Sequence, residues 1–133
     1  DITKIVGWEG TTPVGLAMIT SVLEAVPQIS PRFLRAKYPE HAANDRIFFG
    51  ILVLVSPEHR SMTLFQRLAM EMWQMAAKAG GVLVFDICDF NRINFEAEGV
   101  TERLAANFPG GSVGAIDRQT WYGAELPNPL PGS

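Results

Sequence analysis

The chain has 133 residues, of which 47% are hydrophobic and 19% charged, and its formal net charge is −3. Such a length and composition are those of one soluble globular domain, for which we expect residues 1–126, followed by a proline-rich tail over residues 127–133. The acidic balance excludes the broad basic field of a general nucleic-acid binder. The single cysteine excludes a disulfide within the chain.

No apolar run in the sequence approaches the roughly 18 residues that a membrane span requires. The first residues, Asp-Ile-Thr-Lys, also lack the charged start and apolar stretch of a signal peptide. We therefore expect a cytoplasmic protein that does not act at a membrane. Composition does not decide the oligomeric state, so a homo-oligomer stays open.

The N-terminal third predicts a hairpin and then a long connection. Residues 3–8 alternate weakly and are rich in β-forming side chains, residues 9–13 have turn composition, and residues 14–22 form a second apolar strand. Residues 23–46 are interrupted by prolines, with room for one or two helical turns at 32–38. A connection of this length inside one domain is usually functional or mobile, so we expect an insertion or lid.

The middle of the chain predicts a strand–helix–strand unit. Residues 46–55 and 82–88 are nearly continuous apolar runs, which is typical of strands buried on both faces. Between them, apolar residues recur at helical spacing from an expected N-cap at Ser61 to a stop at Gly80 and Gly81. The residues of this repeat are Phe65, Leu68, Ala69, Met72, Trp73 and Ala76.

The C-terminal third predicts a second helix over residues 94–107 and a final strand over residues 112–121. Gly99 lowers the stability of that helix by about 1 kcal/mol. The complete order of elements predicts an α/β fold with a mixed, twisted sheet, because a strand–helix–strand unit makes a right-handed parallel crossover beside the antiparallel hairpin.

A motif stands where the strand over residues 46–55 ends. Val55, Pro57, Glu58, His59 and Arg60 form the pattern Val-x-Pro-Glu-His-Arg, and a helix begins almost at once. This arrangement resembles the acyl-CoA-binding core of the GNAT (N-acetyltransferase) superfamily, in which a strand ends in V-x-P-x-x-[RQ]-x-x-G-x-[GA]. The hairpin, with its V-G-x-x pattern, and the order of elements extend the resemblance over roughly residues 3–122. It implies a GNAT-like strand–helix–strand core.

The resemblance implies that acetyl-CoA or another acyl-CoA binds where the helix opens. The implied cofactor-binding residues are Leu54, Val55, Arg60, Ser61, Met62, Thr63, Leu64, Phe65 and Asn91. Thr63 and Phe65 replace the two glycines of the family motif, but main-chain N–H groups at a helix start bind phosphate whatever the side chain. Helical spacing predicts that the Phe65 ring turns into the core. The guanidinium of Arg60 suits a phosphate. We expect the opening strand and helices of the family, which supply much of its acceptor pocket, to be absent.

Acyl transfer to an amine requires a base for the ammonium proton, dipoles for the developing oxyanion and an acid for the thiolate. The resemblance implies main-chain N–H groups around Leu54 and Val55 for the oxyanion. It also implies a tyrosine acid, at whose position this chain has Phe95. The catalytic residues are therefore unassigned. The candidates are Glu58, His59, Asp86 and Tyr122.

Several further residues have ordinary structural interpretations. We expect His59 to be a solvated loop residue and Cys88 to be a buried, inert thiol, because an apolar strand precedes it. Residues 86–94 have the oxygen-rich composition of a calcium loop but lack its glycine and its distal glutamate, so we expect no metal site. We expect Trp121 and Tyr122 to pack.

Two functions of different classes follow from these observations. One is an N-acyltransferase that moves an acetyl or acyl group from acyl-CoA to a small-molecule or peptide amine. The other is a GNAT-fold module without catalytic activity that acts through protein–protein contacts. The replaced glycines and the missing acid favour the module, and the retained strand–loop–helix frame favours the enzyme.

Overall fold

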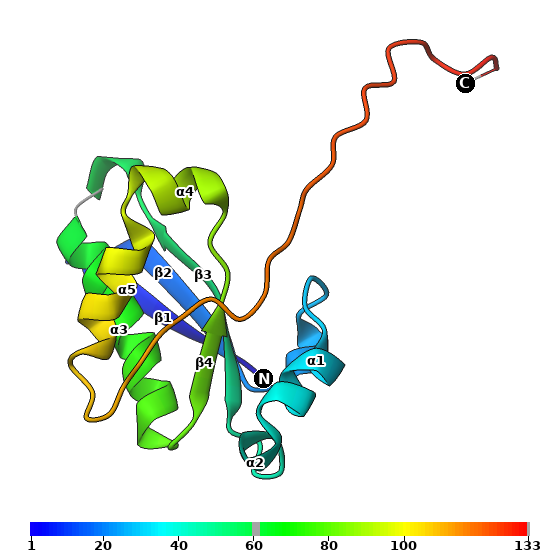
Figure 1. Cartoon of the computed structure of the whole chain (residues 1–133). Helices are drawn as coiled ribbons and strands as arrows, with labels where there is room; N and C mark the ends of the chain where they lie inside the picture. Colours follow the sequence, from blue (N-terminus) through cyan, green and yellow to red (C-terminus); the bar gives the residue numbers. More distant parts are fainter. Residues whose placement is uncertain (60–61, 133) are drawn as a thin grey trace.

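The computed structural model describes residues 1–59 and 62–132, and only the main chain of Met62. Its sheet has four strands in the order β1-β2-β3-β4 (Figure 1). These strands are β1 (Ile2–Glu9), β2 (Thr12–Thr20), β3 (Ile47–Val55) and β4 (Val82–Phe85). The first three strands are antiparallel, and β3 and β4 are parallel. The prediction of an α/β fold with a mixed sheet is therefore confirmed.

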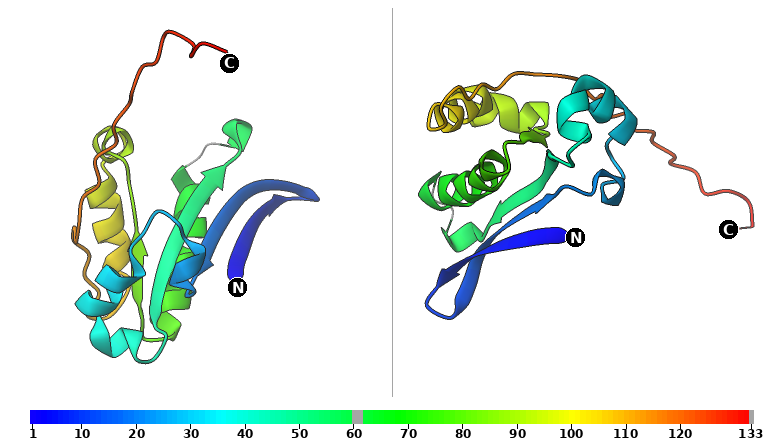
Figure 2. Two further views of the ribbon diagram at one scale, coloured as in Figure 1. Left: turned by 90° about the vertical axis from the view of Figure 1, so that its right-hand side faces the viewer. Right: turned by 90° about the horizontal axis from the view of Figure 1, so that it is seen from below.

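Helices cover the two faces of the sheet unequally (Figure 2). On one side lie α3 (Met62–Lys78), α4 (Asp89–Asn94) and α5 (Ala97–Ala105). On the other side, at the end of the sheet where β2 ends and β3 begins, lie η1 (Leu23–Ala25), α1 (Pro31–Lys37) and α2 (Pro39–Ala42). The short η2 (Pro57–His59) connects β3 to α3.

The two faces bury separate apolar clusters because side chains alternate along each strand. Against α3, the buried residues are Ala17, Ile19, Leu68 and Met72. On the opposite face, the buried residues are Leu23, Val26, Leu34, Ile47 and Phe49. The predicted insertion over residues 23–46 thus contributes three residues to the core. Its first helix is capped by Ser30, whose hydroxyl accepts a hydrogen bond from the N–H of Phe33 (3.3 Å).

Two glycines in the hairpin let α3 approach the sheet closely. A Cβ atom on Gly15 would lie 2.7 Å from Cδ1 of Leu68, and one on Gly7 would lie 3.1 Å from Cδ1 of Leu64. Both atoms are the ends of leucine side chains, which an added Cβ would push aside. The two glycines therefore let Leu64 and Leu68 pack directly on β1 and β2.

The predicted helix over residues 94–107 is confirmed over its central part as α5, but it begins three residues later, and α4 before it was not predicted. Glu96, between the two helices, has a left-handed conformation with φ of 47°. A helix cannot continue through such a residue. The residues that were expected on one face, Ala97, Val100 and Leu104, are buried on α5.

The predicted strand over residues 112–121 is also wrong. These residues belong to no strand, and the segment passes across the face of β4 and then runs away from the sheet (Figure 1). The crossing is anchored by Ile116, which packs on the cluster around Phe49. A segment that crosses strands cannot form a ladder with them. Trp121 and Tyr122 are 83% and 91% exposed, so the expectation that they pack is wrong as well.

Candidate functional site

The two parallel strands β3 and β4 pair over only part of their length. The pairs run from Ile47 with Val82 to Gly50 with Phe85, and β3 then continues to Val55 without β4. The predicted strand over residues 82–88 is therefore too long. From Asp86 onward the chain leaves the sheet (Figure 1).

A β-bulge explains why the strands part at this point. The register between β2 and β3 shifts between Met18 and Ile19, which leaves Ile51 without a partner in β2. A bulge bends its strand and increases the local twist. It directly follows Gly50, the last residue of β3 that pairs with β4. The bulge therefore turns the end of β3 away from β4.

The direction of the main-chain groups beyond the bulge follows from the β2–β3 ladder. The N–H of Ser56 donates to the carbonyl of Val14 (2.8 Å), and Leu54 pairs with Leu16. Because main-chain groups alternate in direction along a strand, those of Val53 and Val55 point away from β2. We call this edge, residues 51–55 on the side away from β2, the open β3 edge. No strand of the described chain pairs with it.

Side chains also change faces at the bulge. Val53 and Val55 pack on the α3 side with Leu64. Leu54 is on the opposite face and is 57% exposed, so the expectation that this strand is buried on both faces fails at its end. An apolar part of the sheet next to the open β3 edge is consequently accessible from solvent.

The side chain of His59, in η2, contacts the hairpin and is not freely solvated. Its Nε2 contacts the carboxylate of Glu9 at the tip of the hairpin, and its side chain is 32% exposed. Its Nδ1 is buried and has no hydrogen-bond partner in the described part of the chain. The interpretation of His59 as a free loop residue is wrong, because the turn between β1 and β2 reaches η2.

The start of α3 follows η2 directly. Arg60 and Ser61, together with the side chain of Met62, lie outside the described residues. Thr63 is exposed, and Leu64 packs against the sheet. Phe65 is 36% exposed, so its expected turn into the core is wrong. Leu64 has the place that helical spacing had assigned to Phe65.

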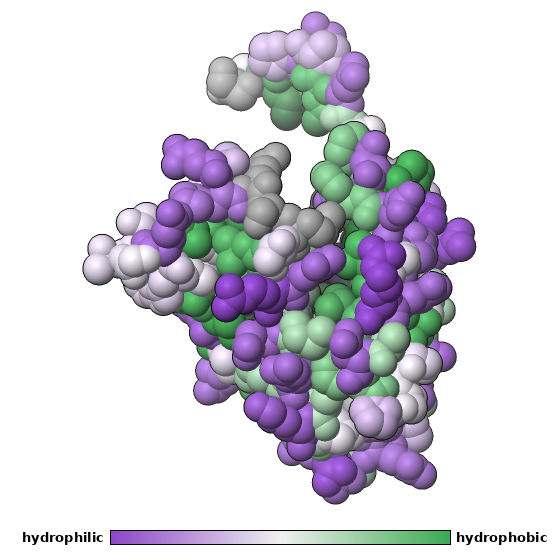
Figure 3. Space-filling model, turned by 90° about the vertical axis from the view of Figure 1, so that its left-hand side faces the viewer, coloured by the Kyte–Doolittle hydropathy of each residue, from purple (hydrophilic) through white to green (hydrophobic). Residues whose placement is uncertain are grey.

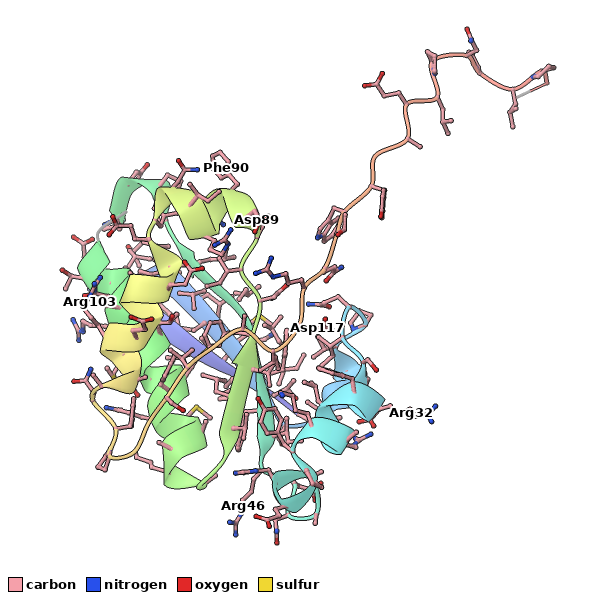
Figure 4. The ribbon with its side chains drawn as sticks, in the orientation of Figure 1. Arg32, Arg46, Asp89, Phe90, Arg103 and Asp117 are labelled. Carbon is pink, nitrogen blue, oxygen red and sulfur yellow. The ribbon has the colours of Figure 1, made fainter. Side chains whose placement is uncertain are left out.

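The chain on the other side of the opening carries mainly exposed residues. Asp86, Cys88 and Asn91 are all exposed, and the prediction of a buried thiol at Cys88 is wrong because β4 ends three residues earlier. Arg92 of α4 binds the carboxylate of Asp89 (3.1 Å) in the same helix and that of Glu98 (2.9 Å) in α5. The second ion pair links the two helices. Figure 4 shows Asp89 and Phe90 on this helix, above the ends of the strands.

The fold places the candidate residues in three separate parts of the molecule. Glu58, His59 and the first residues of α3 lie together after β3, and Asp86 and Asn91 follow β4. Tyr122 lies on the extended tail, which leads away from the sheet (Figure 1). Sequence reasoning missed Val53 and Glu9. The alternation of main-chain direction would have found Val53 only if the bulge had been known, and no local pattern indicated that Glu9 meets His59.

A separate groove runs between α3 and α5, on the side of the molecule that Figure 3 shows. Hydrophilic residues dominate this side, with smaller apolar areas between them (Figure 3). The groove is lined by Thr63, Gln66, Arg67, Met70, Val100, Arg103, Leu104 and Asn107. It starts at the first turn of α3, and thus adjoins the predicted cofactor site.

Comparisons with family models, curated proteins and solved structures gave no match for this chain. Among the described helices, none has both the length and the apolar character needed to cross a membrane. Within the same described residues, His, Cys, Asp and Glu side chains form no group of three or more that could hold a metal ion.

Proposed function

We propose that this protein is an N-acyltransferase that uses acetyl-CoA or another acyl-CoA and transfers the acyl group to a small-molecule or peptide amine. The observation that carries the proposal is the open β3 edge. A bulge directs the main-chain groups of Val53 and Val55 into the opening between β3 and the chain that leaves β4. The proposal also rests on the resemblance of the motif at Val55 to the GNAT superfamily.

The open β3 edge suits the arm of coenzyme A. That arm is an extended chain with two amide groups, and an extended ligand with amides pairs with an exposed strand edge as an additional strand does. The N–H groups of Val53 and Val55 donate, and their carbonyls accept. The same edge would supply fixed dipoles to a thioester oxygen on which negative charge develops.

The phosphates of the cofactor fit the start of α3. This helix has 17 residues, so its N–H groups and dipole offer a strong anion site directly after the open edge. Thr63, in the first turn, has an exposed side chain whose hydroxyl can donate. The missing glycines leave these main-chain donors in place.

The proton of the acceptor amine requires a base near the thioester. Asp86 is the first residue after β4 separates from β3, and it is exposed to solvent. We assign it the role of accepting the ammonium proton through water. Neither Tyr122, on the tail, nor Phe95 offers an acid at the opening, so a departing thiolate would have to take its proton from solvent.

A main-chain donor can be tested by proline. Val55→Pro removes one N–H from the open β3 edge, whereas the β2 ladder does not use that N–H. We expect the turnover of acetyl-CoA with an amine to fall about 100-fold or more, the usual effect of losing one oxyanion donor. Val55→Ala is the matched control, since it truncates the same side chain and keeps the N–H.

Calorimetric titration with acetyl-CoA and free CoA tests the cofactor itself, beside Arg60→Ala. Micromolar binding that this substitution weakens supports the proposal. No binding at millimolar ligand, with a protein that circular dichroism shows to be folded, contradicts it.

A second function is favoured by a different observation. Ile87, Phe90, Ile93 and Phe95, on and beside α4, are 39%, 72%, 68% and 57% exposed. Such a gathering of large apolar side chains is typical of a protein–protein contact. An inactive binding module explains it without acyl-CoA, and this module is the conclusion if the titration finds no ligand.

A further inference from the structure

Strand β1 forms one edge of the sheet, and no strand of the described chain pairs with its outer side (Figure 2). The strand runs from Ile2 to Glu9, and its charged residues are Lys4 and Glu9. Because the outward N–H and C=O groups of an edge strand can bond to another strand, an edge of this length with few charges is a site for strand addition.

The β2 ladders show which residues of β1 point their main-chain groups outward. Leu54 of β3 points its main-chain groups toward β2 and pairs there with Leu16. The next residue of β2, Ala17, therefore points toward β1, where it pairs with Ile5. The main-chain groups of Ile5 thus point inward, and those of the even-numbered residues of β1 point outward.

The same even-numbered residues place their side chains on the face of the hairpin away from α3. Ile5 packs with the cluster under α3, so its neighbours in β1 point to the opposite face. On that face Ile2, Val6 and Trp8 are 39%, 38% and 61% exposed. An added strand would therefore gain both the outward main-chain groups and contact with apolar side chains that solvent now reaches.

A second copy of β1 is complementary to this edge. Antiparallel pairing about a two-fold axis at Val6 brings Val6 opposite itself and Lys4 opposite Trp8 of the second copy. These residues all point their main-chain groups outward, so the register forms hydrogen-bonded pairs. The ammonium of Lys4 meets an indole ring, which attracts a cation. A register that placed Lys4 opposite itself would instead oppose like charges.

The charge of Lys4 also favours a second copy over an unrelated strand. A lysine on an edge strand normally hinders pairing, because its charge would lie against the added strand. In the two-fold register, Trp8 of each copy compensates Lys4 of the other, so the compensation occurs twice. An unrelated strand would need an aromatic ring or a carboxylate at that one position.

We infer that two copies of this chain associate by antiparallel pairing of their β1 strands, with Lys4 of each copy beside Trp8 of the other. The contact joins two four-stranded sheets into one. It leaves the open β3 edge free, because β2 separates β1 from β3, and it does not depend on acyl-CoA. One strand from each copy makes the contact, so the dimer is small in interface and reversible.

Sedimentation equilibrium of the whole chain over a series of concentrations tests the dimer. Val6→Pro removes an outward N–H that the β2 ladder does not use, a change that edge strands tolerate. We expect it to raise the dissociation constant about tenfold or more, because both hydrogen bonds between the two Val6 residues are lost. Val6→Ala is the matched control, since it keeps the N–H and should weaken the dimer less.

A charge exchange tests the register. Lys4→Glu and Trp8→Lys should each raise the dissociation constant roughly fivefold or more, because each disturbs both symmetry-related pairs. The double variant restores opposite charges in these pairs and should recover the dimer. Within one copy the two positions are about 13 Å apart along the strand, so recovery reports a contact between copies. Trp121→Lys, at a tail residue that is 83% exposed, should leave the dissociation constant unchanged.

Circular dichroism and thermal melting would verify that the variants fold, and the charge exchange decides the test if Val6→Pro does not. An unmodified chain that stays monomeric up to millimolar concentration overturns the inference. A dimer that the β1 variants leave unchanged also overturns it and would move the contact to another surface, such as α4. Weakening by both single charge variants without recovery in the double variant overturns the register of Lys4 with Trp8.

Discussion

The chain up to Phe85 and the chain after it use apolar residues differently. Before Phe85, strands and α3 bury side chains such as Phe49, which is 1% exposed. After it come the most exposed apolar side chains of the described residues, among them Phe90, Trp121 and Tyr122. The comparison teaches that apolar composition predicts an element only where a partner surface covers it.

The largest effect that sharpens this comparison is on the free energy of unfolding. Phe49→Ala empties the center of the cluster under α1, and we expect a loss of about 3–5 kcal/mol. Phe90→Ala removes the same atoms from a side chain that is 72% exposed, and should change stability by no more than about 0.5 kcal/mol. Urea denaturation measures both. A comparable loss in the two variants would mean that α4 is buried in solution, for example in an oligomer.

The sequence predicted the first part of the fold well because local signals and tertiary burial agree there. The hairpin, the buried strand of residues 47–55 and the helix between Met62 and Lys78 all have a periodicity that matches the face they bury. In the second part, residues 112–121 have the composition of a strand but cross the sheet instead of following an edge. The amino-acid composition of a segment does not specify whether it runs along a strand or across it.

A second comparison concerns glycines in the same two parts of the chain. A Cβ on Gly81 would lie 2.6 Å from the carbonyl oxygen of Arg46 and 2.8 Å from the ring of Phe48, so Gly81→Ala should cost about 1–3 kcal/mol. A Cβ on Gly114 would meet no atom within 4 Å, and Gly114→Ala should be near neutral. Thermal melting of both variants checks this. A neutral Gly81→Ala would show that the start of β4 can shift away from β3.

The candidate site was predictable in its position but not in its geometry. The motif from Val55 to Arg60 indicated where β3 ends and a helix begins. The bulge at Ile51, which exposes the main-chain groups of Val53 and Val55, has no local signature, because nothing in the apolar run distinguishes one residue from the next. The contact between His59 and Glu9 joins residues far apart in sequence and depends on how the hairpin lies.

A smaller effect is expected at the break between α4 and α5. Glu96 has φ of 47°, a conformation that costs a residue with a Cβ about 1–2 kcal/mol. Glu96→Gly relieves this strain and adds flexibility to the unfolded chain, so we expect a net gain of about 0.5–1 kcal/mol. Glu96→Ala is the control, because it removes the same charge and keeps the strain. A gain in both variants would assign the effect to charge instead, and denaturant titration distinguishes these cases.

The smallest effect should be the pH dependence of the stability that the ion pair between Arg92 of α4 and Glu98 of α5 contributes. The hydrogen bond from Arg92 holds the pKa of Glu98 below its ordinary value, and Glu98 in turn is the main cause that raises the pKa of Arg92. Because the pKa of Glu98 is lower in the folded chain, its contribution is present above the unfolded pKa and is lost as the pH falls through the folded pKa. The melting temperature of the unmodified protein should therefore exceed that of Glu98→Gln slightly at neutral pH, and the difference should close in acid.

The pair is exposed to solvent, so the difference is small and decreases with salt. Glu71→Gln, at an exposed carboxylate without an ion pair among the described residues, should show no such closing gap. A difference that persists unchanged into acid would mean that Glu98 stabilises α5 through its helical position and not through Arg92.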